Sequence, residues 1–496
     1  MEFITTSAEM QLIDRMTIEG IGIPGMVLME KAALKMFDYI HEHFDQSNKI
    51  AVICGIGNNG GDGMALARML IEAGYQADIQ IVGNTLKASD QFIDQMQILL
   101  ALGIHASNML DYTQYDILVD AIFGVGLSRE VGGVFAEAIE RFNEADAVKI
   151  GCDAPSGICC TTGKVLGIAT KCDITITFGY QKRGLVLYPG CDYAGKVIVA
   201  DIGFPKSVAF QYPPTAITYT KADLALLPKR SNDSHKGTYG KVLVVAGTKN
   251  MAGAAYFCAK AAYMTGSGLV QILTAEENRT ILQGLIPEAI MTTYETDEEA
   301  VAKLKEAMKD CKTAVIGPGL SMQELTKTMV KTMLAEYEGK LIIDADGCNV
   351  LHDFLPELKA SNAQIIITPH MKEASRILDM PIGDILENQE EIIFEFSKEN
   401  GVVFVLKNAR TLISWGERLT FINTSGNNGM STGGSGDVLA GMIAGLCSGG
   451  LYVDEAARMG VFCHGLAGDY AREEKGVYSM VASDLLNHIP DALGGR

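Results

Sequence analysis

Short apolar runs recur along the whole chain between helix-like stretches or glycine and aspartate turns, and this alternation restricts the fold more than any other feature. Such runs are typical of strands buried on both faces of a parallel sheet. Helix-like periodicity lies between several of them, for example over residues 64–73 and 89–102. The first half therefore predicts an α/β domain whose mostly parallel sheet is covered by helices on both faces. Its predicted strands are residues 50–54, 79–82, 117–119, 147–152, 174–178 and 197–200.

The alternation stops over residues 204–220, which contain three prolines and no period, and then begins again. A chain of 496 residues is too long for one ordinary core and fits about two domains. We therefore predict two α/β domains in series, over residues 1–215 and 216–496. The predicted strands of the second domain are residues 242–246, 269–273, 314–316, 341–343, 365–368 and 402–406.

Composition excludes several classes of partner. The formal net charge of −19 disfavours nucleic acid and anionic membrane surfaces, so any phosphate site must be built locally from loops and helix ends. The sequence has neither a secretory leader at its start nor an apolar run of about 18 residues. Eleven cysteines without framework spacing favour reduced thiols, and we expect a cytoplasmic protein.

The segment Gly433-Gly434-Ser435-Gly436-Asp437 leads directly into the apolar run 438–444. Glycines allow backbone amides to approach an anion, and the start of a helix adds its positive dipole end. An aspartate at this position can remove the proton of a hydroxyl held beside the phosphate. The segment therefore indicates an anion hole with a general base for phosphoryl transfer. The plain alternative is a tight loop with Asp437 as a helix cap.

A second glycine segment, residues 55–63, follows the first predicted strand and contains a G-x-G-x-x-G fingerprint before a helix. The acid that usually holds the ribose hydroxyl is absent, because the next strand ends in Gly83-Asn84 and Asp78 lies at its other end. We therefore expect a nucleotide-phosphate site and not a hydride-transferring dehydrogenase. A simple glycine turn capped by Asn58 or Asp62 is the alternative.

Three polar residues near the ends of the predicted strands form a candidate cation site. Asn59, Asp120 and Ser156 offer an amide oxygen, a carboxylate and a hydroxyl, which suit a hard monovalent or divalent cation. Singly, each of them is more often a cap or turn residue.

Many short motifs in order carry a family resemblance over nearly the whole chain. NNGGDG, DAIFGVGL, DAPSG, KRGLVLYPG and DIGFP resemble the NAD(P)H-hydrate epimerase domain, which implies a Rossmann-like three-layer fold. SHKGTYGKVLVVAG, GPGL, DADG, TPHMKEASRIL, LKNART and GNNGMSTGGSGDVLAG resemble the ADP- or ATP-dependent NAD(P)H-hydrate dehydratase, a ribokinase-like fold. The order is that of the fused, bifunctional repair enzymes. Asn428 stands where the family usually has proline.

The resemblance implies that the first domain exchanges the R and S epimers of the hydrated nucleotides NADHX and NADPHX. Asp153 is then the acid/base residue, and potassium is held by Asn59, Asp120 and Ser156. The implied substrate-binding residues are Asn58, Asn59, Gly60, Gly61 and Asp62, and Gly124, Val125, Gly126, Leu127, Ser128, Arg129 and Glu130.

For the second domain, the resemblance implies that the S hydrate is phosphorylated by ADP or ATP, with magnesium, and then loses phosphate. Asp437 is the catalytic base, and Ala252, Gly319 and His370 face the hydrate. The implied adenine-nucleotide residues are Lys407, Asn408, Ala409, Arg410, Thr411 and Gly436. Without the family, Lys407 with Arg410 reads as a surface pair at a strand end, and His370 as a turn histidine.

Two other functions compete with this interpretation. The second domain would also fit a ribokinase-like kinase that releases the phosphate ester of a small alcohol, and the first domain a nucleotide sensor without catalysis. The fused first domain and the presence of Asp153 with the cation set favour the repair enzyme. Its family commonly forms homo-oligomers, which we also expect here.

Overall fold

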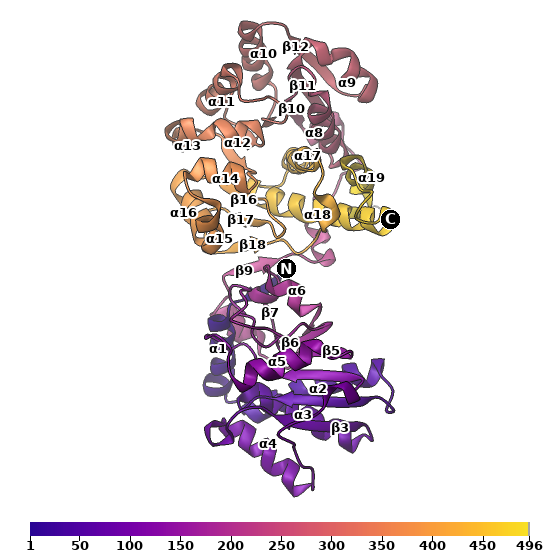
Figure 1. Ribbon diagram of the computed structural model, residues 1–496. Helices are drawn as coiled ribbons and strands as arrows, with labels where there is room; N and C mark the ends of the chain where they lie inside the picture. The colour runs from indigo at the N-terminus through magenta and orange to yellow at the C-terminus, as the bar shows by residue number, and fades with distance from the viewer. Residues whose placement is uncertain (495–496) are drawn as a thin grey trace. The chain divides into compact units, whose positions relative to one another are not determined.

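The computed structural model describes residues 1–494, which divide into two compact units, one of residues 2–216 and one of residues 217–494 with Met1. Figure 1 labels many of their elements along the chain. No helix among the described residues is long and apolar enough to span a membrane.

The first unit contains a six-stranded sheet in which every pair of neighbouring strands is parallel. β2 lies between β3 and β4, so the chain leaves β2 in one direction for β3 and returns on its other side for β4. In parallel sheets, ligands bind at the carboxyl ends of strands beside such a switch point. The strand order is β3 (Gln76–Ile81), β2 (Lys49–Cys54), β4 (Ile117–Ala121), β5 (Val148–Cys152), β6 (Ile174–Phe178) and β8 (Lys196–Ala200).

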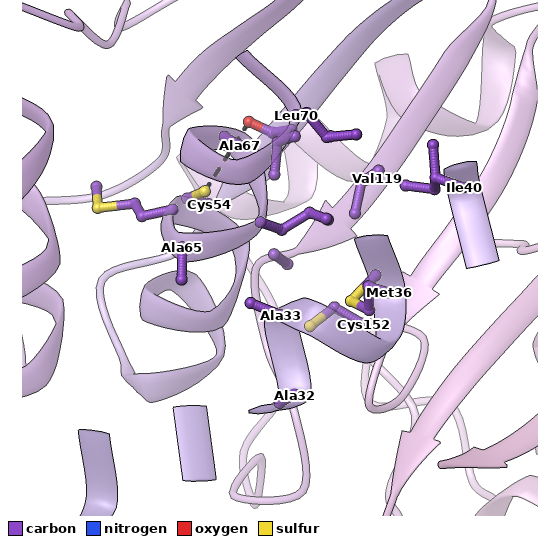
Figure 2. Packing of buried hydrophobic residues seen from close by; sticks show 14 of the residues in the cluster. Ala32, Ala33, Met36, Ile40, Cys54, Ala65, Ala67, Leu70, Val119 and Cys152 are labelled. Carbon is purple, nitrogen blue, oxygen red and sulfur yellow. Dashed lines mark hydrogen bonds between the residues drawn. The ribbon is translucent and has the colours of Figure 1, made fainter. Parts of the chain in front are cut away.

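Alternate residues of the strands enter two different cores, which explains the unbroken apolar runs. Ile50, Val52 and Cys54 pack with helices α2 and α3, whereas Ala51 and Ile53 pack with α5 on the other face. Figure 2 shows the first of these cores. The predicted three-layer α/β arrangement is therefore confirmed. The remaining elements are β1 (Glu2–Thr5), α1 (Ser7–Arg15), α2 (Gly25–His43), α3 (Asn58–Glu72), α4 (Asp90–Ala101), α5 (Val134–Glu144), β7 (Gln181–Lys182), α6 (Gly190–Ala194), α7 (Lys206–Gln211) and, at the division between the units, β9 (Ala216–Thr218).

Two local expectations differ from the structure. Helix α3 begins at Asn58, so most of the predicted glycine loop is the first part of this helix. A side chain at Gly60 would meet the carbonyl oxygen of Gly55 at 1.9 Å, so glycine is needed for close helix packing rather than for a loop. The segment 204–220, predicted to lack regular structure, contains α7 and β9.

The second unit has seven parallel strands followed by an antiparallel hairpin that the sequence analysis missed. Their order is β12 (Ile290–Tyr294), β11 (Leu269–Ala275), β10 (Lys241–Val245), β13 (Thr313–Ile316), β14 (Lys340–Ile343), β15 (Gln364–Ile367), β16 (Val403–Leu406), β17 (Leu412–Ser414) and β18 (Thr420–Ile422). The helices are α8 (Ala252–Met264), α9 (Arg279–Leu285), α10 (Asp297–Lys309), α11 (Glu324–Glu336), α12 (Asp346–Val350), α13 (Leu355–Ala360), α14 (Met371–Leu378), α15 (Ile382–Glu387), α16 (Gln389–Asn400), α17 (Ser435–Ser448), α18 (Val453–Lys475) and α19 (Ala482–Ala492).

Candidate active sites

A cavity of about 660 Å³ lies in the first unit beside the carboxyl ends of β2, β4 and β5. Of the predicted binding residues, Asn58, Asn59, Asp62, Gly124, Val125, Gly126, Leu127, Ser128 and Arg129 line it, as does Asp153. Gly60 and Gly61 are buried inside α3, where a side chain at Gly61 would collide with Met29. Neither glycine nor Glu130 lines the cavity.

Asp153 follows β5 and is held by a buried cation. Its φ of +65° is unusual for a residue with a side chain, which marks a backbone fixed by its surroundings. The Lys182 ammonium donates to Asp153 Oδ1 at 2.6 Å, and the Phe178 amide donates to the same oxygen at 3.1 Å. Lys182 is fully buried and also donates to the Phe178 carbonyl. The ion pair fixes the Asp153 carboxylate at the cavity wall.

Two further carboxyls line the same cavity without such a partner. Asp62 lies in the first turns of α3 and Asp14 near the end of α1. Burial raises the pKa of Asp62 well above its ordinary value, and the charges of Asp153 and Asp14 raise it further. Burial, followed by Asp153, also raises the pKa of Asp14. Carboxyls of this kind retain protons at a pH where exposed acids have lost them.

Asp120 and Ser156 bind each other next to Phe123, which lines this cavity. The Ser156 hydroxyl donates to Asp120 Oδ1 at 2.6 Å, and the Ser156 amide and Thr170 hydroxyl donate to Oδ2. The Phe123 amide donates to the Ser156 hydroxyl, which fixes the loop that begins at Gly124. Asn59 lies against Gly124, and its buried amide nitrogen has no hydrogen-bond partner. The three predicted cation ligands, Asn59, Asp120 and Ser156, are therefore linked through these contacts to the loop that begins at Gly124.

In the second unit, helix α17 begins directly after Gly434, whose φ is +91°, and Asp437 occupies its first turn. Its carboxylate makes no hydrogen bond with any described residue, and no side chain caps this helix. The alternative role of Asp437 as a helix cap is therefore wrong. Burial and, after it, the charge of Asp344 raise the pKa of Asp437 to about 7, and Lys407 opposes the shift. Such a carboxyl is suited to accept a proton near neutral pH.

The ends of three neighbouring strands supply two charged side chains and one hydroxyl near Asp437. Asp344 follows β14, Thr368 follows β15 and Lys407 follows β16. The Lys407 ammonium and the Thr368 hydroxyl donate to Asp344 Oδ1 at 2.6 and 2.7 Å. A Cβ on Gly436 would lie 3.3 Å from Lys407 Nζ, so this cation stands beside the start of α17. Lys407 is mostly enclosed and paired with Asp344, which contradicts its alternative reading as half of a surface pair.

His370 caps helix α14 with its ring. Its Nδ1 accepts from the amides of Lys372 and Glu373, so the other nitrogen, Nε2, carries the proton of the neutral ring. The Glu373 carboxylate accepts from the His370 amide and lies 3.3 Å from Nε2. Burial raises the pKa of Glu373 to about 7, with Lys407 opposing this shift. His370 thus has the turn role that we considered, at the edge of the charged cluster.

The other predicted residues of this unit form two groups. A side chain at Gly319 would lie 2.9 Å from Ala254 and 3.1 Å from Met251, which places Gly319 beside Ala252 at the start of α8. The hairpin loop between β16 and β17 contains Asn408, Ala409, Arg410 and Thr411. Arg410 donates to the Thr424 carbonyl within the same unit.

Sequence reasoning assigned no role to Asp14, Lys182, Asp344 or Glu373. Lys182, Asp344 and Glu373 lie in the motifs KRGLVLYPG, DADG and TPHMKEASRIL, respectively, whereas Asp14 lies outside the motifs named above. The sequence signal that could have indicated these residues is a charged residue at the end of a predicted strand or within the apolar face of a predicted helix. The partners of Lys182 and Asp344 are remote in sequence, so only the fold identifies these two pairs.

Both halves of the chain match known families. Residues 25–184 match the YjeF-related protein N-terminus, and residues 242–491 match the NAD(P)H-hydrate dehydratase family. A bifunctional NAD(P)H-hydrate repair enzyme from Moorella thermoacetica is 35% identical, covering 99% of this chain and 96% of the relative. A second, from Thermofilum pendens, is 34% identical over 98% of this chain and 95% of its own length. The chain belongs to the bifunctional NAD(P)H-hydrate repair enzyme family.

Solved structures agree with this family for part of the chain. An ADP/ATP-dependent NAD(P)H-hydrate dehydratase from Bacillus subtilis, co-crystallized with ATP and Mg²⁺, is 26% identical with a TM-score of 0.50. It covers 56% of this chain and 98% of its own. A ribokinase-like superfamily protein from Enterococcus faecalis is 27% identical, also with a TM-score of 0.50, covering 57% of this chain and 96% of its own. The predicted ribokinase-like α/β fold is confirmed.

Proposed function

We propose that this chain repairs NADHX and NADPHX at two separate sites. The first unit exchanges the R and S epimers in its cavity, and the second unit dehydrates the S epimer with ADP or ATP. The observation that carries the proposal is the match of both halves, in order and at full length, to repair enzymes, together with one unpaired acid site in each half.

The second site supports a phosphorylation that prepares an elimination. Asp437 takes the hydroxyl proton while the hydroxyl oxygen attacks the terminal phosphorus. The first amides of α17, which have no acceptor inside the helix, face the developing charge, and the Lys407 cation stands beside them. Phosphate then leaves far more readily than hydroxide, and loss of a proton from the neighbouring carbon restores the dihydropyridine ring.

We further propose that magnesium arrives with the nucleotide. The described residues contain no group of three or more His, Cys, Asp or Glu side chains placed to hold a metal. Magnesium commonly uses one or two carboxylates together with substrate phosphates. Asp344 fits this role because its Oδ1 accepts from Lys407 and Thr368, whereas no described group donates to its Oδ2. The ion would neutralise phosphate charge.

Potassium is proposed for the first site. The Asn59 amide has a buried nitrogen without a partner and no hydrogen bond to its oxygen, so exchanging their positions offers a carbonyl oxygen at no cost. Together with Asp120 and Ser156, this gives an all-oxygen set, which fits an alkali cation better than zinc. The ion would order the loop at Gly124. We also propose a cytoplasmic homo-oligomer, on the family resemblance and the eleven unbridged cysteines.

The test is to incubate each purified epimer with the full chain, with and without ADP. We expect epimer exchange without ADP, and return of the dihydronicotinamide absorbance with release of inorganic phosphate when ADP is added. A stable phosphorylated product would instead identify a small-molecule kinase. Unchanged epimer ratios would remove the catalytic assignment of the first unit.

A further inference from the structure

The cavity of the first unit contains three carboxyls but a close cation for only one of them. Asp14, Asp62 and Asp153 all line it, and Lys182 pairs with Asp153. Asp14 and Asp62 form no hydrogen bond or ion pair with any residue that the structure describes. An uncommitted carboxyl at a cavity wall can bind a ligand or move a proton.

A second observation at the same wall indicates that bound species complete this site, in the case of Asn59 the proposed potassium ion. The buried Asn59 amide nitrogen, one helical turn before Asp62, has no hydrogen-bond partner. Unpaired buried amides are rare in folded proteins because each costs about 1–3 kcal/mol. The unpaired acids and the unpaired amide thus belong to one polar surface.

The neighbouring charges fix how the two free acids ionise. Besides Asp153 and Lys182, the cavity presents Lys87 and Arg129, and neither lies within 4 Å of a carboxylate. The thiols of Cys54 and Cys152 also stand near Asp62, but burial raises the pKa of both, so they remain neutral. Burial and the charge of Asp153 raise the pKa of both acids, and Asp14 adds to the shift of Asp62.

We propose that Asp62 and Asp14 are the acid and base that exchange the hydroxyl group of the hydrate, with Asp153 as a fixed negative charge. This inference rests on the proposed epimerase function of the first unit. Asp62 donates a proton to the departing hydroxyl, and Asp14 accepts a proton from the water that replaces it.

The step balances without any external reagent. The bond between the ring carbon and the hydroxyl oxygen breaks, its electron pair leaves with the oxygen, and the Asp62 proton completes a water molecule. The lone pair of the ring nitrogen forms a carbon–nitrogen double bond, and the resulting cation faces the carboxylates. A water oxygen then adds to the other face of that carbon, and Asp14 takes its proton. Asp14 now holds the proton and Asp62 does not, so the pair is ready for the reverse direction.

The pairing of Asp153 distinguishes it from the other two acids. Its Oδ1 accepts from Lys182, Phe178 and Thr177, which holds this oxygen as an acceptor. A carboxylate fixed in this way stabilises a nearby cation, whereas proton transfer would disturb the ion pair with Lys182. Asp153 is therefore assigned to electrostatic stabilisation, and the acid/base role that the sequence suggested for it passes to Asp62 and Asp14.

The experiment measures epimer exchange and oxygen incorporation in ¹⁸O-labelled water without ADP, for wild type, Asp62→Asn, Asp14→Asn and the exposed control Asp38→Asn. The expected result is one solvent oxygen per exchange in wild type and in the control. Asp62→Asn and Asp14→Asn each lose about 10²- to 10⁴-fold in exchange and in label incorporation together. Hydrate affinity, measured by calorimetry, stays within a few-fold.

ADP-dependent dehydration of the S epimer by the second unit continues in each variant, and the retained hydrate affinity is the folding control for the first unit. Wild-type exchange without label incorporation would overturn the proposal, since the carbon–oxygen bond would then stay intact. Near-normal exchange in either variant, or loss of affinity at normal turnover, would also overturn it. A wild type that exchanges no epimers would instead reject the proposed function.

Discussion

Replacing Asp437 by asparagine is expected to remove dehydration while making the second unit more stable at alkaline pH. Asparagine has nearly the same shape as aspartate but cannot accept the hydroxyl proton. Loss of a general base lowers the rate by about 10² to 10⁴. The same residue is costly to ionise in the folded chain, since its carboxylate has no hydrogen bond and stands near Asp344.

The size of the stability gain follows from the pKa. Burial, with Asp344, raises the pKa of Asp437 from 3.8 to about 7, and one pKa unit corresponds to about 1.4 kcal/mol. Ionisation in the folded state is therefore about 4 kcal/mol harder than in the unfolded chain. Asp437 is partly exposed, so we expect solvent to reduce this to about 2 kcal/mol.

The sign follows from proton counts. Between pH 4 and 7 the unfolded chain has lost the Asp437 proton and the folded chain keeps it, so stability falls as pH rises. Above pH 7 the Asp437 carboxyl is ionised in both the folded and the unfolded chain, so its destabilising effect has reached its full size. Asparagine has no such loss, so the variant exceeds wild type by about 2 kcal/mol at pH 8 and by less than half of that at pH 5.

Trp415 is the single tryptophan of the chain and lies in the second unit, so its fluorescence reports the unfolding of that unit. Denaturant titrations at pH 5 and 8 should be compared for wild type, Asp437→Asn and the exposed control Asp310→Asn. Near-normal dehydration by Asp437→Asn would refute the base assignment. A variant less stable than wild type at pH 8 would refute the ionisation argument.

Three further predictions concern the rates of dehydration and of epimer exchange. The wild-type dehydration rate should rise about tenfold per pH unit below pH 7 and level off above it, because the pKa of Asp437 is about 7 and its ionised form is needed; a flat profile would contradict this. Asp153→Asn should lower epimer exchange by at least 10²-fold and leave dehydration of the S epimer unchanged, whereas loss of both activities in a folded protein would indicate a shared site. Asp120→Asn disturbs the hydrogen bonds that hold Ser156. It should raise the hydrate concentration needed for half-maximal exchange, measured at a series of potassium concentrations. If the exchange rates of wild type and variant are both independent of potassium concentration, the cation site is rejected.

The apolar pattern predicted most of the parallel strands, because strands buried on both faces leave continuous apolar runs. It missed β12, and also β17 and β18, which are three residues each and too short to show a period. It also placed the start of α3 six residues late, since glycines usually indicate a loop. Here Gly60 is helical because the carbonyl of Gly55 leaves no room for a side chain. Close packing overrode the local preference.

Within the sites, the sequence by itself determined the residues whose chemistry depends on near neighbours. Asp437 follows its glycines directly, so its place at a helix start could be read from the chain. Only the tertiary structure decided which charges are neutralised, because Lys407 meets Asp344 across 63 residues and Lys182 meets Asp153 across 29. Strand order sets these meetings, and burial then raises the pKa of each acid without a partner, so proton-transfer roles are properties of the folded chain.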